Sequence, residues 1–160
     1  MITGATGFVG FHTARALLQA GHEVSLLVRS RDKMEQLFGR GRIRHFTVGD
    51  ITDICKVRKA LANCDAVVHS AAMVSTHAAD ADAVYRTNVE GTSNVIGAAL
   101  DRGVASIIHV SSVTALYDPA ATVLDENSPP GTGAPKSPVS DMCAACRRRG
   151  SRSVSLTRRR

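Results

Sequence analysis

Three glycines near the start of the chain have the spacing of a phosphate-binding turn. Gly4, Gly7 and Gly10 stand in the segment TGATGFVG, residues 3–10. In such a turn the first glycine makes a tight bend, the second lets the backbone approach a pyrophosphate, and the third lets a helix pack closely on a strand. The N-terminus of that helix then offers free N–H groups and a partial positive charge to the phosphates. The segment therefore predicts a dinucleotide-binding loop, with a tight turn that binds no ligand as the alternative.

A second group that could contact the same ligand follows the next apolar segment. About 20 residues after the glycine loop, NAD-binding domains commonly carry an acid that binds the ribose 2′-hydroxyl. This chain has Arg29-Ser30-Arg31 near that position. An arginine cannot accept a hydrogen bond from the hydroxyl, but it can pair with a 2′-phosphate. The position predicts NADP in preference to NAD, with Arg29 as the contact. A solvated surface arginine is the alternative.

Strand and helix patterns alternate along the chain, and these elements must position the residues above. Apolar, β-branched runs predict strands over 23–28, 43–48, 66–69 and 106–110. Helical periodicity predicts helices over 8–20, 31–38, 53–64 and 80–102. Before the glycine loop, the first strand is reduced to Met1 and Ile2. One face of the first predicted helix carries Phe8, Phe11, Ala14, Leu17 and Leu18.

This alternation predicts the fold class. Strands that alternate with helices at this spacing form a parallel sheet with right-handed crossovers. The chain is therefore expected to be α/β, with a doubly wound sheet of the Rossmann type that binds its ligand at the carboxyl ends of the strands. We expect this nucleotide-binding domain to occupy residues 1–133.

Composition and charge limit the classes of partner. Hydrophobic residues make up 44% of the 160 residues and charged residues 21%, and no apolar run reaches the roughly 20 residues that span a bilayer. Without a leader pattern, we expect a cytoplasmic protein with no membrane partner. Of the net charge of +6, residues 134–160 carry +7 and residues 1–133 carry −1. A near-neutral domain without a nucleic-acid motif predicts no specific nucleic-acid partner. Non-specific binding of phosphate backbones by the basic tail is the alternative.

The last 27 residues differ in character from the rest. Residues 134–160 are rich in Ser and Arg and show no apolar periodicity, so we expect a basic tail that is disordered or loosely attached. Cys143 and Cys146 form a C-x-x-C within it. No second cysteine pair or downstream histidine pair follows to complete a zinc site. We therefore expect no metal site.

Six segments along residues 1–133 together resemble the extended short-chain dehydrogenase/reductase family. That family includes nucleotide-sugar epimerases and dehydratases, dihydroflavonol-type reductases and 3β-hydroxysteroid dehydrogenase/isomerases. The segments, in order, are TGATGFVG (3–10), GD (49–50), VVHSAA (67–72), NVEGTSNV (88–95), HVSSVTAL (109–116) and LDENSPPG (124–131).

The resemblance implies a set of site residues. Asp50 is expected to meet the adenine amino group, and Ser112 to be the catalytic serine. Asn88 is expected to order the active-site helix and the proton relay. The implied contacts of the coenzyme, NADP by preference or NAD, are Thr3, Gly4, Thr6, Gly7, Phe8, Val9, Gly10, Arg29, Asp50, Ile51, Ser70, Ala71, Ala72 and Asn88.

Several of these positions have a purely structural alternative. His69, in the segment that the resemblance places beside the ribose and nicotinamide, could be a strand-end histidine hydrogen-bonded to the backbone. Asn88 could make a structural bond within its helix. Ser111 and Ser112 could simply end a strand.

The family's catalytic pair, Tyr-x-x-x-Lys, is missing from these 160 residues. Four residues after the two tyrosines, Tyr85 and Tyr117, stand Val89 and Ala121. The resemblance implies hydride transfer between the nicotinamide and a small carbinol or carbonyl substrate, but without this pair we expect the chain itself to be inactive. A non-catalytic NADP(H)-binding module is the alternative. We also expect the tail to be a frame-shifted reading of a longer gene, the start to be assigned too late, and the C-terminal substrate lobe to be missing.

Overall fold

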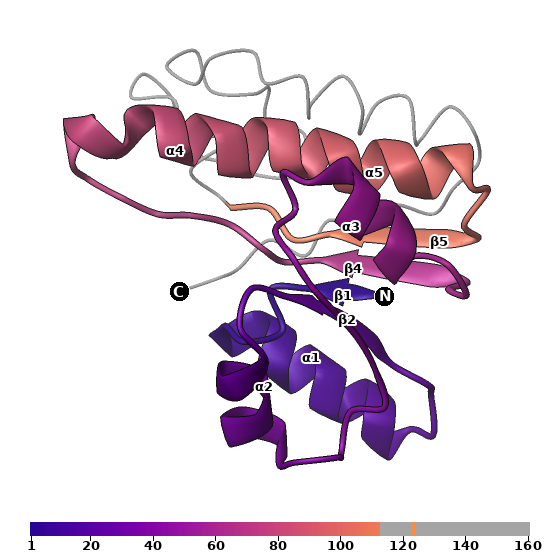
Figure 1. Ribbon diagram of the computed structural model, residues 1–160. Coiled ribbons are helices and arrows are strands. Elements are labelled where there is room, and N and C mark those ends of the chain that lie inside the picture. Colours follow the sequence, from indigo (N-terminus) through magenta and orange to yellow (C-terminus); the bar gives the residue numbers. More distant parts are fainter. Residues whose placement is uncertain (113–122, 124–160) are drawn as a thin grey trace.

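The computed structural model describes residues 1–112 and residue 123, and within them five parallel strands form one sheet (Figure 1). The strand order is β3-β2-β1-β4-β5. The strands are β1 (Ile2–Thr3), β2 (Ser25–Val28), β3 (His45–Val48), β4 (Ala66–His69) and β5 (Ser106–His109). The chain extends the sheet from β1 to one side and then returns to extend it from β1 to the other. The point where the order reverses, between β1 and β4, is where doubly wound sheets bind their ligands.

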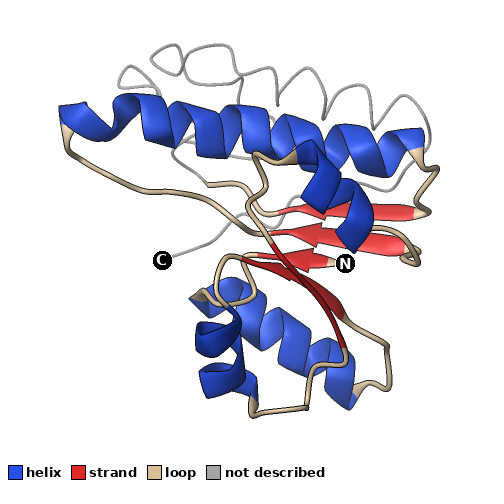
Figure 2. Ribbon diagram, in the orientation of Figure 1, coloured by secondary structure: helices blue, strands red, loops and turns tan. Residues whose placement is uncertain are grey.

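Helices cover both faces of this sheet (Figure 2). One face is covered by α1 (Phe8–Gln19) and α2 (Arg31–Phe38), and the other by α3 (Ile54–Ala60), α4 (Ala81–Tyr85) and α5 (Thr92–Asp101). A 3₁₀ turn over Ala78–Asp80 leads into α4, and a π-helical turn over Arg86–Gly91 joins α4 to α5. None of the helices in this part of the chain is both long and apolar enough to cross a bilayer.

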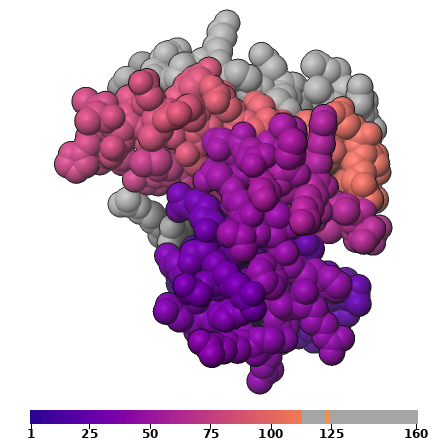
Figure 3. Space-filling view, viewed as in Figure 1, coloured from indigo at the N-terminus to yellow at the C-terminus, as the bar shows by residue number. Residues whose placement is uncertain are grey.

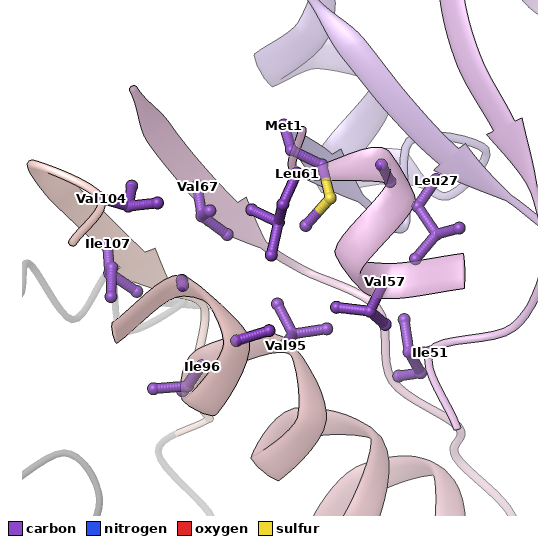
Figure 4. Packing of buried hydrophobic residues seen from close by; sticks show 13 residues of the cluster. Met1, Leu27, Ile51, Val57, Leu61, Val67, Val95, Ile96, Val104 and Ile107 are labelled. Atoms are coloured by element: carbon purple, nitrogen blue, oxygen red, sulfur yellow. The ribbon is translucent and has the colours of Figure 1, made fainter. Parts of the chain in front are cut away.

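The hydrophobic core is divided by the sheet into two clusters. Residues of β2 alternate between the clusters, with Leu26 and Val28 on the side of α1 and Leu27 on the side of α3, as the two-residue period of a strand requires. Figure 4 shows the second cluster, in which Val57 of α3 and Val95 of α5 pack over the strands. In the space-filling view, α3 and the helix from α4 to α5 form a continuous surface (Figure 3). Both sheet faces are therefore covered, and the carboxyl edge carries the loops.

Side-chain caps set where the second and third helices begin. Ser30 accepts a hydrogen bond from the Lys33 N–H at the start of α2. Asp53 accepts bonds from the N–H groups of Cys55 and Lys56 at the start of α3. These oxygens pair with N–H groups that a helix leaves free in its first turn.

The α/β fold class and the doubly wound sheet predicted from the sequence are confirmed, and every predicted strand and helix is present. The strands predicted from residues 23 and 43 begin two residues later, and the third helix ends at Ala60 instead of residue 64. The long helix predicted over 80–102 contains the π-helical turn. Gly91 ends that turn, and a Cβ at Gly91 would lie 2.6 Å from Ile51 Cδ1.

The placement of Phe8 in the apolar face of the first helix is wrong. Its side chain is 71% exposed and stacks edge-on with the His12 ring, whereas Ala14 is fully buried. Phe8 is the first residue of α1 and directly follows the N-cap Gly7 of the glycine loop. Helical periodicity alone does not show that the first residue of the stripe extends past the sheet.

Candidate functional site

The glycine loop has the geometry that its spacing predicts. Gly4 takes the left-handed conformation, with φ of 71°, and a Cβ there would lie 2.6 Å from the Ala71 nitrogen. The Gly7 N–H donates to the Gly4 carbonyl at 2.9 Å, which closes the turn. A Cβ at Gly10 would lie 2.3 Å from the same carbonyl oxygen. The first glycine therefore makes the tight bend and the third allows α1 to approach it, as expected.

The N-terminus of α1 has no side-chain cap. Its N-cap is Gly7, which has no side chain to accept a hydrogen bond, and its first turn contains no acidic residue. The helices α2 and α3, which follow β2 and β3, are capped by Ser30 and Asp53. Gly7 is exposed, and the nearest atom that a Cβ there would meet is 3.3 Å away. The partial positive charge at the N-terminus of α1 is therefore not offset by a capping or acidic side chain, as a phosphate site requires.

Hydrogen bonds join the end of β1 to the loop after β4. The Thr3 carbonyl accepts from the N–H of Ser70 at 3.4 Å and from its hydroxyl at 2.8 Å. The Thr3 hydroxyl accepts from the Ala71 N–H at 3.3 Å. Thr3 has no exposed surface, whereas Ser70 and Ala71 are half-buried and Ala72 is exposed. Of these predicted contacts, Thr3 lies behind the others and positions them.

Hydrogen bonds and packing hold the loop after β3 in place. One carboxylate oxygen of Asp50 accepts from the N–H of Thr52 at 3.0 Å and from its hydroxyl at 2.9 Å. Ile51 is buried against α5. The Asn94 side-chain amide donates to the carbonyls of Ile51 and Thr52, each at 3.1 Å. Sequence reasoning assigned no role to Asn94, although it is the second asparagine of the segment NVEGTSN.

Asn88 uses both ends of its side-chain amide on one residue. Its Oδ1 accepts from the Met73 N–H at 2.8 Å, and its Nδ2 donates to the Met73 carbonyl at 2.8 Å. Asn88 lies in the π-helical turn, so this pair of bonds fixes the extended segment after β4 against the helix. The structural alternative for Asn88 is therefore present, formed with the neighbouring segment and not within its own helix. Its part in catalysis stays a prediction.

The His69 ring is hydrogen-bonded to side chains, so the alternative in which the backbone satisfies it is wrong. Its Nδ1 is hydrogen-bonded to the Thr3 hydroxyl at 2.6 Å and its Nε2 to the Thr92 hydroxyl at 2.8 Å, so side chains and not the backbone satisfy the ring. The residue has no exposed surface, and its ring stacks on that of His109 at 5.2 Å. Burial, with a smaller contribution from His109, lowers the pKa of His69 to about 3. The ring is therefore neutral near pH 7.

The remaining predicted residues lie at the same edge of the sheet. Arg29 follows β2 and is exposed, Thr6 and Val9 are half-buried in the glycine loop, and Ser112 is exposed three residues after β5 ends. The structure thus brings the ends of β1 to β5 to one edge, as parallel strands require.

In residues 1–112 and 123, no three His, Cys, Asp or Glu side chains are grouped so that they could hold a metal ion. Cys143 and Cys146, and the tail over 134–160, lie outside the described residues.

Comparison with known proteins agrees with this geometry. The NAD dependent epimerase/dehydratase family matches residues 1–155. UDP-glucose 4-epimerase of Neisseria meningitidis is 33% identical over 82% of this chain and 41% of its own length. The 2-alkyl-3-oxoalkanoate reductase of Stenotrophomonas maltophilia is 35% identical over 70% of this chain and 32% of its own length.

A solved structure extends the comparison to the fold. A short-chain dehydrogenase/reductase superfamily protein from Agrobacterium tumefaciens, with bound NAD, superposes with a TM-score of 0.79 at 26% identity. The match covers 98% of this chain and 47% of that one, so the chain spans about a third to a half of the length of these proteins. With the glycine loop at the carboxyl edge of a 3-2-1-4-5 parallel sheet and a family match over residues 1–155, the chain belongs to the NAD dependent epimerase/dehydratase family.

Proposed function

We propose that this chain binds a nicotinamide dinucleotide with its pyrophosphate against the N-terminus of α1. The observation that carries the proposal is the glycine turn into this helix, whose N-cap Gly7 provides no side-chain cap and whose first turn contains no acidic residue. Gly4 and Gly10 are both packed so closely that a side chain would strike backbone atoms. Only glycine fits at these two positions, as is required of a loop whose backbone approaches phosphates.

The two ends of the dinucleotide would then reach the other loops of the same edge. The adenosine would extend over the ends of β2 and β3, where Asp50 and the exposed Arg29 lie. The nicotinamide would extend toward the ends of β4 and β5, where Ala72 and Ser112 lie. The Asn88 and Asn94 amides support this arrangement because each holds a neighbouring loop against the helix from α4 to α5.

NADP is the coenzyme that the charges favour. The Arg29 guanidinium makes no hydrogen bond or ion pair with any residue in the described part of the chain. Arg31, two residues later, is already paired with Glu35 at 2.8 Å and lies over the Phe46 ring. Arg29 is therefore the cation available to a 2′-phosphate, and a charge-assisted contact of this kind is stronger than a neutral hydrogen bond.

The chemistry proposed for this lineage is hydride transfer with a small carbinol or carbonyl substrate. When bound, the nicotinamide supplies or accepts the hydride at its C4. Ser112 would orient the substrate oxygen, and Asn88 would keep the segment after β4 in place through Met73. Because the 160 residues contain no Tyr-x-x-x-Lys pair, this chain is proposed to bind coenzyme without turning over substrate. The second candidate is a module whose function is to bind NADP(H) without catalysis, and it rests on the same missing pair.

Calorimetric titration of the 160-residue chain with NADPH and with NADH tests the proposal. We expect saturable binding of one molecule per chain, with the tighter affinity for NADPH, and no oxidation of NADPH above background with carbonyl substrates. Absence of heat with either coenzyme would contradict the proposed function. Steady oxidation of NADPH by the purified chain would contradict the proposal that it does not turn over substrate.

A further inference from the structure

His69 lies where three elements meet at the site. The ring belongs to the last residue of β4 and is hydrogen-bonded to Thr3, the last residue of β1, and to Thr92, the first residue of α5. These partners are 66 and 23 residues away along the chain. The three side chains have at most 2% of their surface exposed. One buried ring therefore connects the strand that leads into the glycine loop to the helix on the far side of β4.

The bonds use the whole hydrogen-bonding capacity of a neutral imidazole. In a neutral ring one nitrogen donates and the other accepts, and a threonine hydroxyl can do either. Among the described residues, the titratable group against His69 is His109, whose ring stacks on it. Burial of the His69 ring disfavours its charged form, and a charge on His109 would disfavour it further. The bridge is therefore a neutral structural connection and not a proton-transfer group.

Thr3 connects this bridge to the glycine loop. It directly precedes Gly4, its carbonyl accepts both bonds from Ser70, and its hydroxyl also accepts from the Ala71 N–H. Gly4 packs on the same Ser70-Ala71 backbone, with 2.6 Å from its would-be Cβ to the Ala71 nitrogen. A shift of the Thr3 side chain would therefore move both surfaces between which the glycine turn is formed.

We infer that His69 is a positioning residue for the coenzyme: the bridge Thr3–His69–Thr92 holds the glycine loop in the conformation that binds the pyrophosphate. The inference rests on the proposed function. Without the bridge, the loop populates that conformation only part of the time. The apparent affinity for coenzyme then falls by the populated fraction, although none of the three side chains touches the coenzyme.

Replacing Thr92 by Val tests the bridge, because Val keeps the shape of the side chain and removes its hydroxyl. We expect the affinity for NADPH to fall about threefold to tenfold, the factor that one hydrogen bond of ordinary net strength is worth. Thr92→Ser keeps the hydroxyl and is expected to retain the affinity. Thr47→Val is the matched control, because Thr47 is also buried but lies in β3, away from the bridge. Its affinity is expected to equal that of the wild type.

The outcomes separate this inference from the proposed function. Wild-type protein that binds neither coenzyme overturns both. If the wild type binds coenzyme, either of two results overturns the bridge alone. One is an unchanged affinity in Thr92→Val, and the other is a loss of affinity in Thr47→Val equal to that in Thr92→Val.

A measurement on the wild type covers the case in which Thr92→Val does not fold. In protein with ¹⁵N-labelled histidine, the His69 ring is expected to give the signals of one neutral tautomer from pH 5 to pH 8. Saturation with NADPH is expected to shift those signals, although the ring has no exposed surface. A ring that titrates in this range, or signals that coenzyme leaves unchanged, would overturn the inference.

Discussion

Gly10 lies against the Gly4 carbonyl so closely that a Cβ on Gly10 would be 2.3 Å from its oxygen and 2.6 Å from its carbon. Both atoms are backbone, so the contact cannot be relieved by turning a side chain. The next nearest atom, the Ser70 hydroxyl oxygen at 2.8 Å, is itself bonded to the Thr3 carbonyl. The packing of α1 on the end of β1 therefore depends on a missing side chain.

Gly10→Ala is expected to lower the free energy of unfolding by about 1–3 kcal/mol, the usual cost of forcing extra atoms into a packed site. It should also weaken NADPH binding at least tenfold, because α1 must move away from the turn. Urea denaturation and calorimetry measure the two effects. The control is Gly103→Ala, which is strained by its φ of 71° but meets no atom within 4 Å. It should lose stability and keep its coenzyme affinity; equal losses of affinity in both variants would contradict the account.

Gly7→Ala is expected to separate binding from stability. The Gly7 φ of −97° suits any residue, and the nearest atom to a Cβ would be 3.3 Å away, so the fold should lose no more than about 1 kcal/mol. The added methyl group would stand where the pyrophosphate is proposed to approach. We expect normal urea denaturation and at least a tenfold weaker affinity for NADPH. Unchanged affinity in a folded Gly7→Ala protein would place the phosphates elsewhere.

Arg29→Ala is expected to remove the preference for NADPH while leaving the affinity for NADH unchanged. Loss of one charge-assisted contact of about 1.5–3 kcal/mol corresponds to roughly tenfold or more in affinity for NADPH. Arg31→Ala is the matched control, since Arg31 is already paired with Glu35. It should alter the ratio of the two affinities much less. If Arg31→Ala loses the preference and Arg29→Ala keeps it, the two arginines have been assigned in the wrong order.

The stability of the protein is expected to fall as the pH drops below about 6.5. The folded-state pKa of His69 is lowered to about 3 and that of His109 is lowered by burial, so the unfolded state binds more protons below the ordinary value of 6.5. Each such ring costs about 1.4 kcal/mol of unfolding free energy per pH unit between its folded and unfolded pKa values. Above about pH 7 this contribution is constant.

Urea denaturation from pH 5 to pH 8 checks this dependence, with His69→Gln as the comparison. Gln does not titrate, so the variant should lose less stability between pH 7 and pH 5 than the wild type does. Identical slopes for the two proteins would show that the pKa of His69 is the same in the folded and unfolded states, which would contradict the lowering by burial.

The sequence predicts the sheet because each strand and helix has its own local pattern. Short apolar runs such as 66–69 and the helical stripe of α1 depend only on neighbouring residues. The bends at Gly4 and the close approach at Gly10 were also predictable, since their spacing implies both. Phe8 was misplaced because periodicity does not show where a helix extends beyond the sheet that it covers.

The supporting contacts could not be predicted from spacing. Asn94 reaches Ile51 and Thr52 across more than 40 residues. The two hydroxyl partners of His69 are 66 and 23 residues away along the chain. Such bonds depend on which elements become neighbours in the sheet. The π-helical turn over Arg86–Gly91 has a similar origin, because Gly91 packs against Ile51 of a different loop.

The most direct test of the account is to titrate ¹⁵N-labelled protein with NADPH and follow the backbone amides at the start of α1. If these groups bind the pyrophosphate, the N–H signals of Phe8, Val9 and Gly10 should shift more than those at the starts of α2 and α3, where Ser30 and Asp53 already occupy the N–H groups. Saturable binding that leaves the three α1 amides unshifted would contradict the central claim.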